Sequence, residues 1–328
     1  MLITQTPLRI SLAGGGTDLP DYYRRHGGAV VSGAIDKYLY VILNSRFDDQ
    51  IYISYSKKEI VDVVDDIRHE LVREAMKKAE VDRGVEIAIM ADIPSEGCGL
   101  GSSSSLTVGL LNAFYTYRGV QVPAERLARE ACEIEIDICG KPIGKQDQYI
   151  AAYGGLRYFA FNADESVDVE DLAAHNGSRG IGHTLLLFYT NITRSADVIL
   201  EEQKANTVNK AEFLAAIRAL ADRARDAIVE NRYAALGDVL RENWEAKKEL
   251  ASTITNPAID TMVARCMDAG AAGCKVCGAG GGGFLLAACP ADRVEAVKQG
   301  MSDYREMPFF FERCGSKVIF NVESYDWK

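Results

Sequence analysis

Stretches rich in β-branched and aromatic residues alternate with amphipathic stretches along the first half of the chain. Residues 2–12 and 30–44 have the composition of strands, and residues 51–55 show the alternation of a strand with one buried face. Residues 65–80 have helical spacing, and residues 85–91 predict a further apolar strand. After a Gly/Ser loop, an apolar helix is predicted up to about Tyr117. The remaining predictions before residue 190 are a helix and two strands, at 123–138, 154–161 and 183–190.

The pattern changes after residue 190. Residues 195–269 are rich in Leu, Ala, Glu, Lys and Arg at helical spacing, and Asn256-Pro257 interrupts them. A glycine-rich stretch follows, and then a predicted strand, helix and strand at 284–289, 291–301 and 318–322. Because strands and helices mix without a regular βαβ alternation, the pattern favours an α+β fold over a doubly wound sheet. We predict an N-terminal domain of residues 1–190 and a C-terminal domain of residues 191–328.

Composition and charge restrict the class of partner. The 328 residues include 37 Lys and Arg against 47 Asp and Glu, and this net charge of −10 argues against a nucleic-acid or anionic-membrane surface. A small anionic substrate stays open, because one pocket can be positive in an acidic protein. No run is typical of a membrane span or a signal peptide, and the eight Cys are scattered. We therefore expect a cytoplasmic protein with reduced thiols; its oligomeric state stays open.

The segment from Pro94 to Ser105 has the densest chemical signal. Its glycines and four consecutive serines lie between a predicted strand and a predicted helix. Glycine lets backbone N–H groups approach an anion, and the helix N-terminus adds free donors and a favourable dipole. Serine hydroxyls there can also ligate Mg²⁺. The segment predicts a phosphate-binding loop rather than a flexible connector, although it lacks the spacing and the Lys of a Walker A loop.

Two further glycine-rich segments lie near the two ends of the chain. In the first, a strand with Arg9 runs into Gly14-Gly15-Gly16-Thr17-Asp18. Arg9 would either hold negative charge in a cleft or face solvent, and Asp18 alone is typical of a turn or a helix cap. The second segment, Gly278 to Gly283, contains a literal G-x-G-x-x-G, but a strand follows where a dinucleotide site needs a helix. Close packing next to a ligand or another backbone accounts for it better.

Carboxylates between residues 130 and 150 supply candidate chemistry. Glu135 lies between two isoleucines on a predicted helix, and Asp147 follows in a Gly/Gln turn. A carboxylate base and a metal-ligating carboxylate are what phosphoryl transfer requires. Most acidic residues on helices are merely solvated, so neither residue is assigned on its own.

Together these segments resemble the three motifs of the GHMP kinase superfamily, in the family's order and across the whole chain. The motifs are Pro7-x-Arg9-x5-Gly15-x-Thr17-Asp18, the loop from Pro94 to Ser105, and the stretch from Gly278 to Gly283. The resemblance implies a two-domain α+β fold, with an N-terminal domain of the ribosomal-S5 type and a ferredoxin-like C-terminal domain. The active site would lie between them.

Within the family, the first motif, Ile35-Asp36-Lys37-Tyr38 and the stretch from Gly144 to Tyr149 are most similar to the D-glycero-D-manno-heptose 7-phosphate kinases. This resemblance implies transfer of the γ-phosphoryl group of ATP to the anomeric hydroxyl of the sugar phosphate, giving a 1,7-bisphosphate. Two alternatives stay open. One is a GHMP kinase for fucose, another hexose or mevalonate, and the other is a non-catalytic nucleotide- or sugar-binding regulator on the same fold.

The resemblance also implies roles for the residues around the reacting groups. Asp147 matches the catalytic Asp of the family, and Arg9 matches an Arg beside it. Glu135 matches a Mg²⁺-ligating Glu, with Glu133 as the alternative. Ser103, or else Ser102, matches a serine that contacts Mg²⁺ and phosphate. ATP would bind along the loop residues Gly97, Gly99, Leu100, Gly101, Ser102, Ser103 and Ser104.

The acceptor side is assigned in the same way. Asp18 matches a residue that binds sugar hydroxyls in galactokinases, which have Glu-His in place of Gly15-Gly16. The two glycines open space for a bulkier, phosphorylated sugar. We therefore expect the sugar to contact Gly15, Gly16, Thr17, Asp18, Gly280 and Gly281. Thr193 and Arg194 follow a predicted strand and open a helix, so they are assigned to the substrate phosphate, with a plain helix cap and surface Arg as the alternative.

Overall fold

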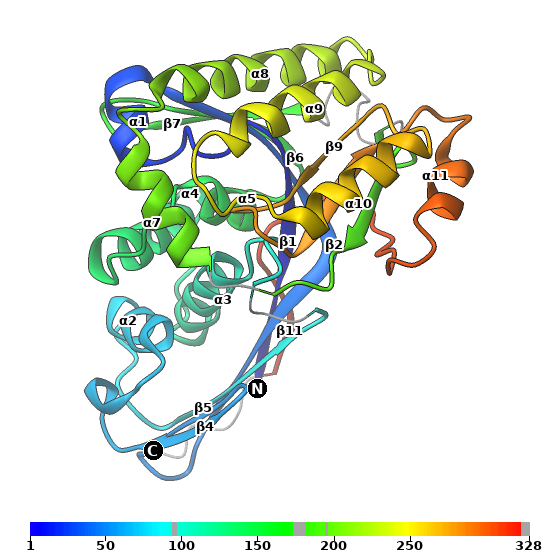
Figure 1. Cartoon of the computed structure of the whole chain (residues 1–328). Helices are drawn as coiled ribbons and strands as arrows, with labels where there is room; N and C mark the ends of the chain where they lie inside the picture. Colours follow the sequence, from blue (N-terminus) through cyan, green and yellow to red (C-terminus); the bar gives the residue numbers. More distant parts are fainter. Residues whose placement is uncertain (94–96, 173–180, 194–195, 323–328) are drawn as a thin grey trace.

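The computed structural model describes residues 1–93, 97–172, 181–193 and 196–322. In this part of the chain the strands form two sheets, which Figure 1 shows with their helices. The larger sheet has eight strands in the order β11-β1-β2-β5-β3-β4, with β6 on β2 and β7 on β6. Its members are β1 (Leu2–Ala13), β2 (Gly28–Ser45), β3 (Ile51–Ser54), β4 (Lys58–Val61), β5 (Val85–Ala91), β6 (Leu156–Phe161), β7 (Val167–Asp171) and β11 (Lys317–Asn321).

The antiparallel pair β1 and β2 is the framework of the larger sheet. Arg9 of β1 lies opposite Ala34, with register shifts on either side of this stretch. β2 changes neighbours along its length, because its first half pairs with β6 and its second half pairs with β5. One long strand therefore joins two parts of the sheet, and the C-terminal end of β1 approaches the second sheet (Figure 1).

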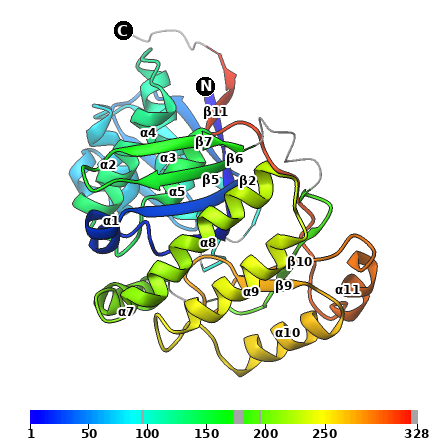
Figure 2. The same ribbon diagram turned by 90° about the horizontal axis from the view of Figure 1, so that it is seen from above.

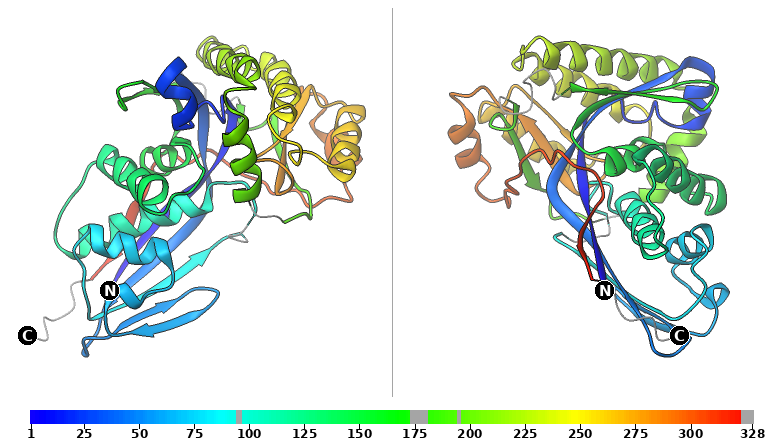
Figure 3. Two further views of the ribbon diagram at one scale, coloured as in Figure 1. Left: turned by 60° about the vertical axis from the view of Figure 1, so that its left-hand side comes forward. Right: turned by 180° about the vertical axis from the view of Figure 1, so that it is seen from behind.

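Helices cover one side of the larger sheet, as both views in Figure 3 show. α3 is buried along almost its whole length because it lies between β1, β2 and the other helices, which explains why nearly every residue from Leu106 to Tyr115 is apolar or small. The helices of this region are α1 (Pro20–His26), a short 3₁₀ turn (Val64–Asp66), α2 (Glu70–Lys78), α3 (Ser102–Tyr117), α4 (Ala124–Cys132), a π-helix (Glu133–Ile138) and α5 (Gln146–Tyr153).

The rest of the chain is mostly helical around a three-stranded sheet in the order β8-β10-β9. α8 packs against β1 and β2, and α9 packs against both β1 and β9, so these two helices connect the sheets (Figure 2). The elements are β8 (Leu185–Tyr189), α7 (Ala196–Asn206), α8 (Ala211–Val229), α9 (Ala235–Lys248), α10 (Pro257–Asp268), β9 (Gly273–Val276), β10 (Phe284–Ala288) and α11 (Val294–Gly300).

The predicted α+β class is confirmed, and the predicted strands at 2–12, 30–44 and 85–91 correspond to β1, β2 and β5. The predicted helical region after residue 195 contains α7 to α10. β8 ends at Tyr189, just before the predicted boundary, yet it pairs with β10, while the last strand, β11, returns to β1. The division at residue 190 stays a prediction, and strand pairing crosses it in both directions. No helix of the described residues is long and apolar enough to cross a membrane.

Candidate active site

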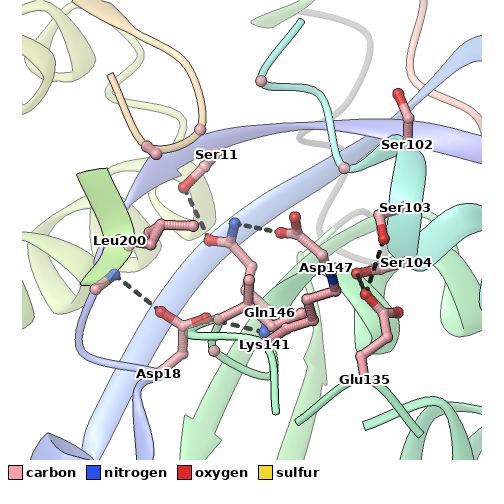
Figure 4. A pocket seen from close by; sticks show the side chains of 18 of the residues that line it. Ser11, Asp18, Ser102, Ser103, Ser104, Glu135, Lys141, Gln146, Asp147 and Leu200 are labelled. Carbon is pink, nitrogen blue, oxygen red and sulfur yellow. Dashed lines mark hydrogen bonds between the residues drawn. The ribbon is translucent and has the colours of Figure 1, made fainter. Parts of the chain in front are cut away.

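A cavity of about 330 Å³ lies where the two sheets approach each other. Its wall combines the end of β1, the glycine loop before α3, the π-helix and the start of α5 with residues of α7, α9 and β9. Figure 4 shows the polar side chains that converge on it. Most of the candidate residues named from the sequence, which lie far apart along the chain, therefore share one cavity.

Arg9 and Asp147 form a two-pronged ion pair in this cavity. Arg9 Nε donates to Asp147 Oδ1 at 2.8 Å, and Arg9 Nη2 donates to Oδ2 at 2.6 Å. Nη1 donates to the carbonyl of Gly99 at 2.7 Å, so the same guanidinium also fixes the glycine loop. Arg9 is buried, whereas the Asp147 side chain is 25 % exposed. The geometry orients the carboxylate and leaves part of it accessible to a ligand.

Two residues that the sequence did not single out hold Asp147 from its other side. Asp147 lies in the first turn of α5, and Gln146 Nε2 donates to its Oδ1 at 3.1 Å. The Ser11 hydroxyl donates to Gln146 Oε1 at 2.8 Å. This chain of hydrogen bonds, visible in Figure 4, couples β1 to the start of α5. In the sequence Gln146 is notable only as the neighbour of Asp147, and Ser11 carries no signal.

The glycine loop has the conformation that only glycine adopts without strain. Gly97, Gly99 and Gly101 have φ of 69°, 74° and 79°, and α3 begins immediately after Gly101. The backbone N–H groups of the first turn of α3 therefore lie at the cavity, together with the positive end of the helix dipole. Leu100 is different, because it is fully buried outside the cavity wall and its carbonyl accepts from Arg9 N at 3.0 Å.

Glu135 projects from the π-helix toward the start of α3. The hydroxyls of Ser103 and Ser104 each donate to Glu135 Oε2 at 3.1 Å. Its Oε1 is buried and has no hydrogen-bond partner, and burial raises the pKa of the carboxyl to about 7 despite the hydroxyl donors. An unsatisfied carboxylate oxygen beside two hydroxyls fits the hard oxygen donors that Mg²⁺ prefers.

The alternative residues that the sequence left open differ in their contacts. Ser102 points away from Glu135, and its hydroxyl lies 3.2 Å from the sulfur of Cys98 (Figure 4). Glu133 is outside the cavity wall and forms an ion pair with Lys78 at 2.6 Å. Ser102 lines the cavity with Ser103 and Ser104, but the hydroxyls that donate to Glu135 are those of Ser103 and Ser104. Within the described residues, no cluster of three or more His, Cys, Asp or Glu has metal-ligand geometry.

Asp18 is buried at the opposite side of the cavity. Its Oδ1 accepts from Gly16 N at 2.9 Å and its Oδ2 accepts from Gln146 N at 3.0 Å. Burial raises its pKa, and these two backbone donors oppose that shift. Gly15 and Gly16 line the cavity beside it, whereas the Thr17 hydroxyl donates to the carbonyls of Gly14 and Ala29 and lies outside the wall.

The remaining acceptor residues that the structure describes fall outside the cavity wall. Gly281 N donates to the carbonyl of Ile254 at 2.6 Å, and Gly280 packs on the same residue. Gly278 and Ala279 line the cavity in their place. Thr193 is exposed and not part of the wall. Arg194 lies outside the described residues.

Several cavity residues come from segments in which the sequence offered no motif. Gln203 of α7 lies next to Gly16, and three lysines reach the wall from a loop, a helix and a strand. They are Lys141, Lys247 and Lys275. Lys141 pairs with Glu70 at 2.6 Å and Asp197 at 3.8 Å, which joins α2 to α7 at the rim.

Comparisons with known proteins agree with this site. Residues 61–155 match the GHMP kinases N terminal domain, and residues 224–305 match the GHMP kinases C terminal domain. The chain is 32 % identical to a D-glycero-alpha-D-manno-heptose 7-phosphate kinase of Campylobacter jejuni, over 86 % of this chain and 88 % of the relative. It is 27 % identical to L-fucokinase/L-fucose-1-P guanylyltransferase of Bacteroides fragilis, over 86 % of this chain and 34 % of that protein.

A solved structure has the same fold. It is described as a D-glycero-D-manno-heptose 1-phosphate kinase from Bacteroides thetaiotaomicron, with a TM-score of 0.81, 24 % identity and coverage of 99 % of this chain and 100 % of that one. The fold and site therefore define a phosphotransferase that uses ATP as donor. The chain belongs to the GHMP kinase family, and the predicted family and two-region α+β fold are confirmed.

Proposed function

We propose that this kinase transfers the γ-phosphoryl group of ATP to the anomeric hydroxyl of D-glycero-D-manno-heptose 7-phosphate, giving the 1,7-bisphosphate. The observation that carries the proposal is the pairing of Arg9 with Asp147 across the cavity from Glu135 and its serines. The substrate class comes from the likeness to the Campylobacter relative. A cytoplasmic location, where ATP is available, belongs to the same proposal.

Asp147 is proposed as the general base. Its carboxylate accepts the proton of the anomeric hydroxyl as that oxygen bonds to the γ-phosphorus, and the bond from the γ-phosphorus to the β-bridging oxygen breaks to release ADP. Arg9 holds the carboxylate by two hydrogen bonds and adds positive charge where negative charge develops. Most of the acceleration comes from positioning and charge neutralisation rather than from the base.

Mg²⁺ fits the site on the donor side. Ser103 and Glu135 would hold it, because Glu135 Oε1 is buried without a partner and the Ser103 hydroxyl lies at the same carboxylate. When bound, the ion neutralises charge on the phosphates of the donor. The backbone N–H groups from Gly97 to Ser104 are proposed to bind those phosphates, with Leu100 anchoring the loop from within the core.

The acceptor is proposed to bind between Asp18 and the two cavity glycines. Gly15 and Gly16 line the wall there and present no side chain, which suits a large sugar phosphate. Asp18 and Thr17 support the turn through backbone hydrogen bonds. Gly280 and Gly281 support the neighbouring wall by packing on Ile254.

Phosphorus NMR of the product tests the proposed reaction. With Mg-ATP and D-glycero-D-manno-heptose 7-phosphate, we expect a new resonance coupled to the anomeric proton, while the resonance of the 7-phosphate remains. The coupling also identifies the anomer. A new phosphate on any other carbon would overturn the proposed position of attack, and this matters because the two heptose relatives have names that differ in phosphate position.

A further inference from the structure

Lys275 is a buried lysine in the cavity wall that the proposed chemistry does not use. It lies on β9, where it is only 2 % exposed. Its Nζ donates to the carbonyl of Leu12 at 3.3 Å and to Asn243 Oδ1 at 3.2 Å. Both acceptors are neutral, and Lys275 takes part in none of the ion pairs found among the described residues. The ammonium can still donate one more hydrogen bond.

An ammonium group in this position is costly without a negative partner, because burial removes its hydration. Burial lowers the pKa of Lys275 to about 8; Cys277 opposes the shift, and the neighbouring charge of Arg9 adds to it. Asp147 is engaged by Arg9, and the carboxylate of Asp18 accepts from the backbone N–H groups of Gly16 and Gln146. An anionic ligand would restore the balance and favour the charged form of the lysine.

The contacts of Lys275 place it on the acceptor side of the cavity. Its partner Leu12 lies on β1 between Ser11 and the glycines Gly15 and Gly16. Ser11 and the two glycines line the wall. The glycine loop proposed to bind the donor phosphates contacts the chain two residues beyond Lys275, where Gly99 packs against Cys277. Lys247 lies one turn beyond Asn243 on α9 and donates to the carbonyls of Val276 and Gly278, so it stabilises the backbone next to Lys275.

We propose that Lys275 binds the anionic group of the acceptor, a phosphate ester, and thereby determines specificity for the phosphorylated sugar over the free sugar. This inference rests on the proposed function, since it concerns the same acceptor. It places the recognition of the phosphate on β9, whereas Thr193 lies outside the cavity wall.

The direct test is Lys275→Met, which keeps the shape of the side chain and removes the charge. Calorimetry with the ATP analogue AMPPNP bound compares the Kd of heptose 7-phosphate with that of the free heptose. We expect the Kd of the phosphorylated sugar to rise about 10- to 100-fold, as for the loss of one charged hydrogen bond, while the Kd of the free heptose and of AMPPNP changes by less than about threefold. Equal losses for both sugars, or no loss, would overturn the proposal.

Two comparison variants separate recognition from structure. Asn243→Ala removes the hydrogen bond between Lys275 and Asn243 but keeps the ammonium group of Lys275. The preference for the phosphorylated sugar should therefore persist. If Asn243→Ala and Lys275→Met have the same effect, Lys275 is only a structural strut. Arg194→Met tests the assignment made from the sequence, and a loss of preference confined to that variant contradicts the role of Lys275.

Failure of the proposed function leaves a different signature. A wild-type protein that binds ATP but does not turn over heptose 7-phosphate would contradict the function, and Lys275 is then tested with inorganic phosphate as the probe. We expect phosphate to raise the melting temperature of the wild type more than that of Lys275→Met. Equal shifts in the two proteins would overturn the anion site independently of turnover. The melting temperatures without phosphate report whether Lys275→Met is folded.

Discussion

Arg9 contacts both Asp147, the proposed base, and the glycine loop proposed to bind the donor phosphates. Three of the guanidinium donors are in use, two on the carboxylate and one on the Gly99 carbonyl of the loop. The position of the base is therefore tied to the position of the loop proposed to bind the donor phosphates. A small displacement of either would be expected to misalign the reacting atoms.

Replacing Asp147 by Asn tests the base directly. The amide keeps the size of the side chain but cannot take the proton of the sugar hydroxyl, so kcat should fall about 10²- to 10⁴-fold. Binding of ATP should change little, because the carboxylate is not part of the loop. Stopped assays for ADP and calorimetry for ATP measure the two effects separately. Turnover close to that of the wild type would remove Asp147 from the role of base.

Glu135 should make the stability of the metal-free protein depend on pH. Burial raises its pKa from 4.5 to about 7, so the folded protein binds this proton more tightly than the unfolded chain does. The contribution is therefore fully present below the unfolded value of 4.5 and is lost as the pH rises toward about 7. The Glu135→Gln variant has no ionisable group at this position, so its stability should not change with pH in this way. The melting temperature of the wild type should fall relative to this variant over that window, and a difference that does not vary with pH would contradict the account.

At the scale of elements, the π-helix determines which carboxylate faces the cavity. The sequence predicts one helix over residues 123–138, whereas the structure has α4 up to Cys132 and a wider π-helical turn from Glu133 to Ile138. Glu135 then points to Ser103 and Ser104, while Glu133 points to Lys78. π-helical turns are rare, and many lie at functional sites.

Glu133 and Glu135 form a matched pair for testing this element. Glu135→Gln should raise the Mg²⁺ concentration needed for half-maximal activity by about tenfold or more, because one charged oxygen ligand is lost. Glu133→Gln removes only a partly exposed ion pair and should change it by less than about twofold. Titration of the activity of each variant with Mg²⁺ measures the two effects. Equal effects would mean that the π-helix does not select the ligand.

The elements themselves were largely predictable, because their periodicity and turn residues are local in the sequence. The three glycine-rich segments also indicated the site, since their spacing is characteristic. Ser11, Gln146 and Lys275 could not be located in this way. Lys275 reaches the carbonyl of Leu12 across a separation of 263 residues, and the packing of α9 against both β1 and β9 brings the two together. The same applies to the unsatisfied oxygen of Glu135, which depends on the π-helical turn.

At the scale of the whole molecule, two glycine segments hold the two sheets together at the cavity. Gly278 approaches Gly99 so closely that a Cβ on Gly278 would lie 2.6 Å from the Gly99 Cα. Its φ of +62° is also unfavourable for any other residue. The contact couples the turn after β9 to the glycine loop that is proposed to bind the donor phosphates.

Gly278→Ala should therefore raise the KM for ATP by about tenfold or more, because the loop must move to accommodate the methyl group. Gly119→Ala is the matched control. Gly119 has a similar φ of +74° but no atoms within 4 Å of its added Cβ, so only the backbone strain of about 1 kcal/mol remains. Steady-state kinetics and melting temperatures of both variants check this. An unchanged KM in Gly278→Ala would show that the two segments move independently.

The measurement that tests the central claim most directly is coupled ADP release with Mg-ATP and a panel of acceptors. The panel contains D-glycero-D-manno-heptose 7-phosphate, the free heptose, mannose, fucose, galactose and mevalonate. We predict that kcat/KM for the heptose 7-phosphate exceeds that of every other acceptor by about 100-fold or more. Comparable or faster turnover of a free sugar or of mevalonate would contradict the proposed substrate, and ATP binding without turnover of any acceptor would contradict the assignment of a catalytic function.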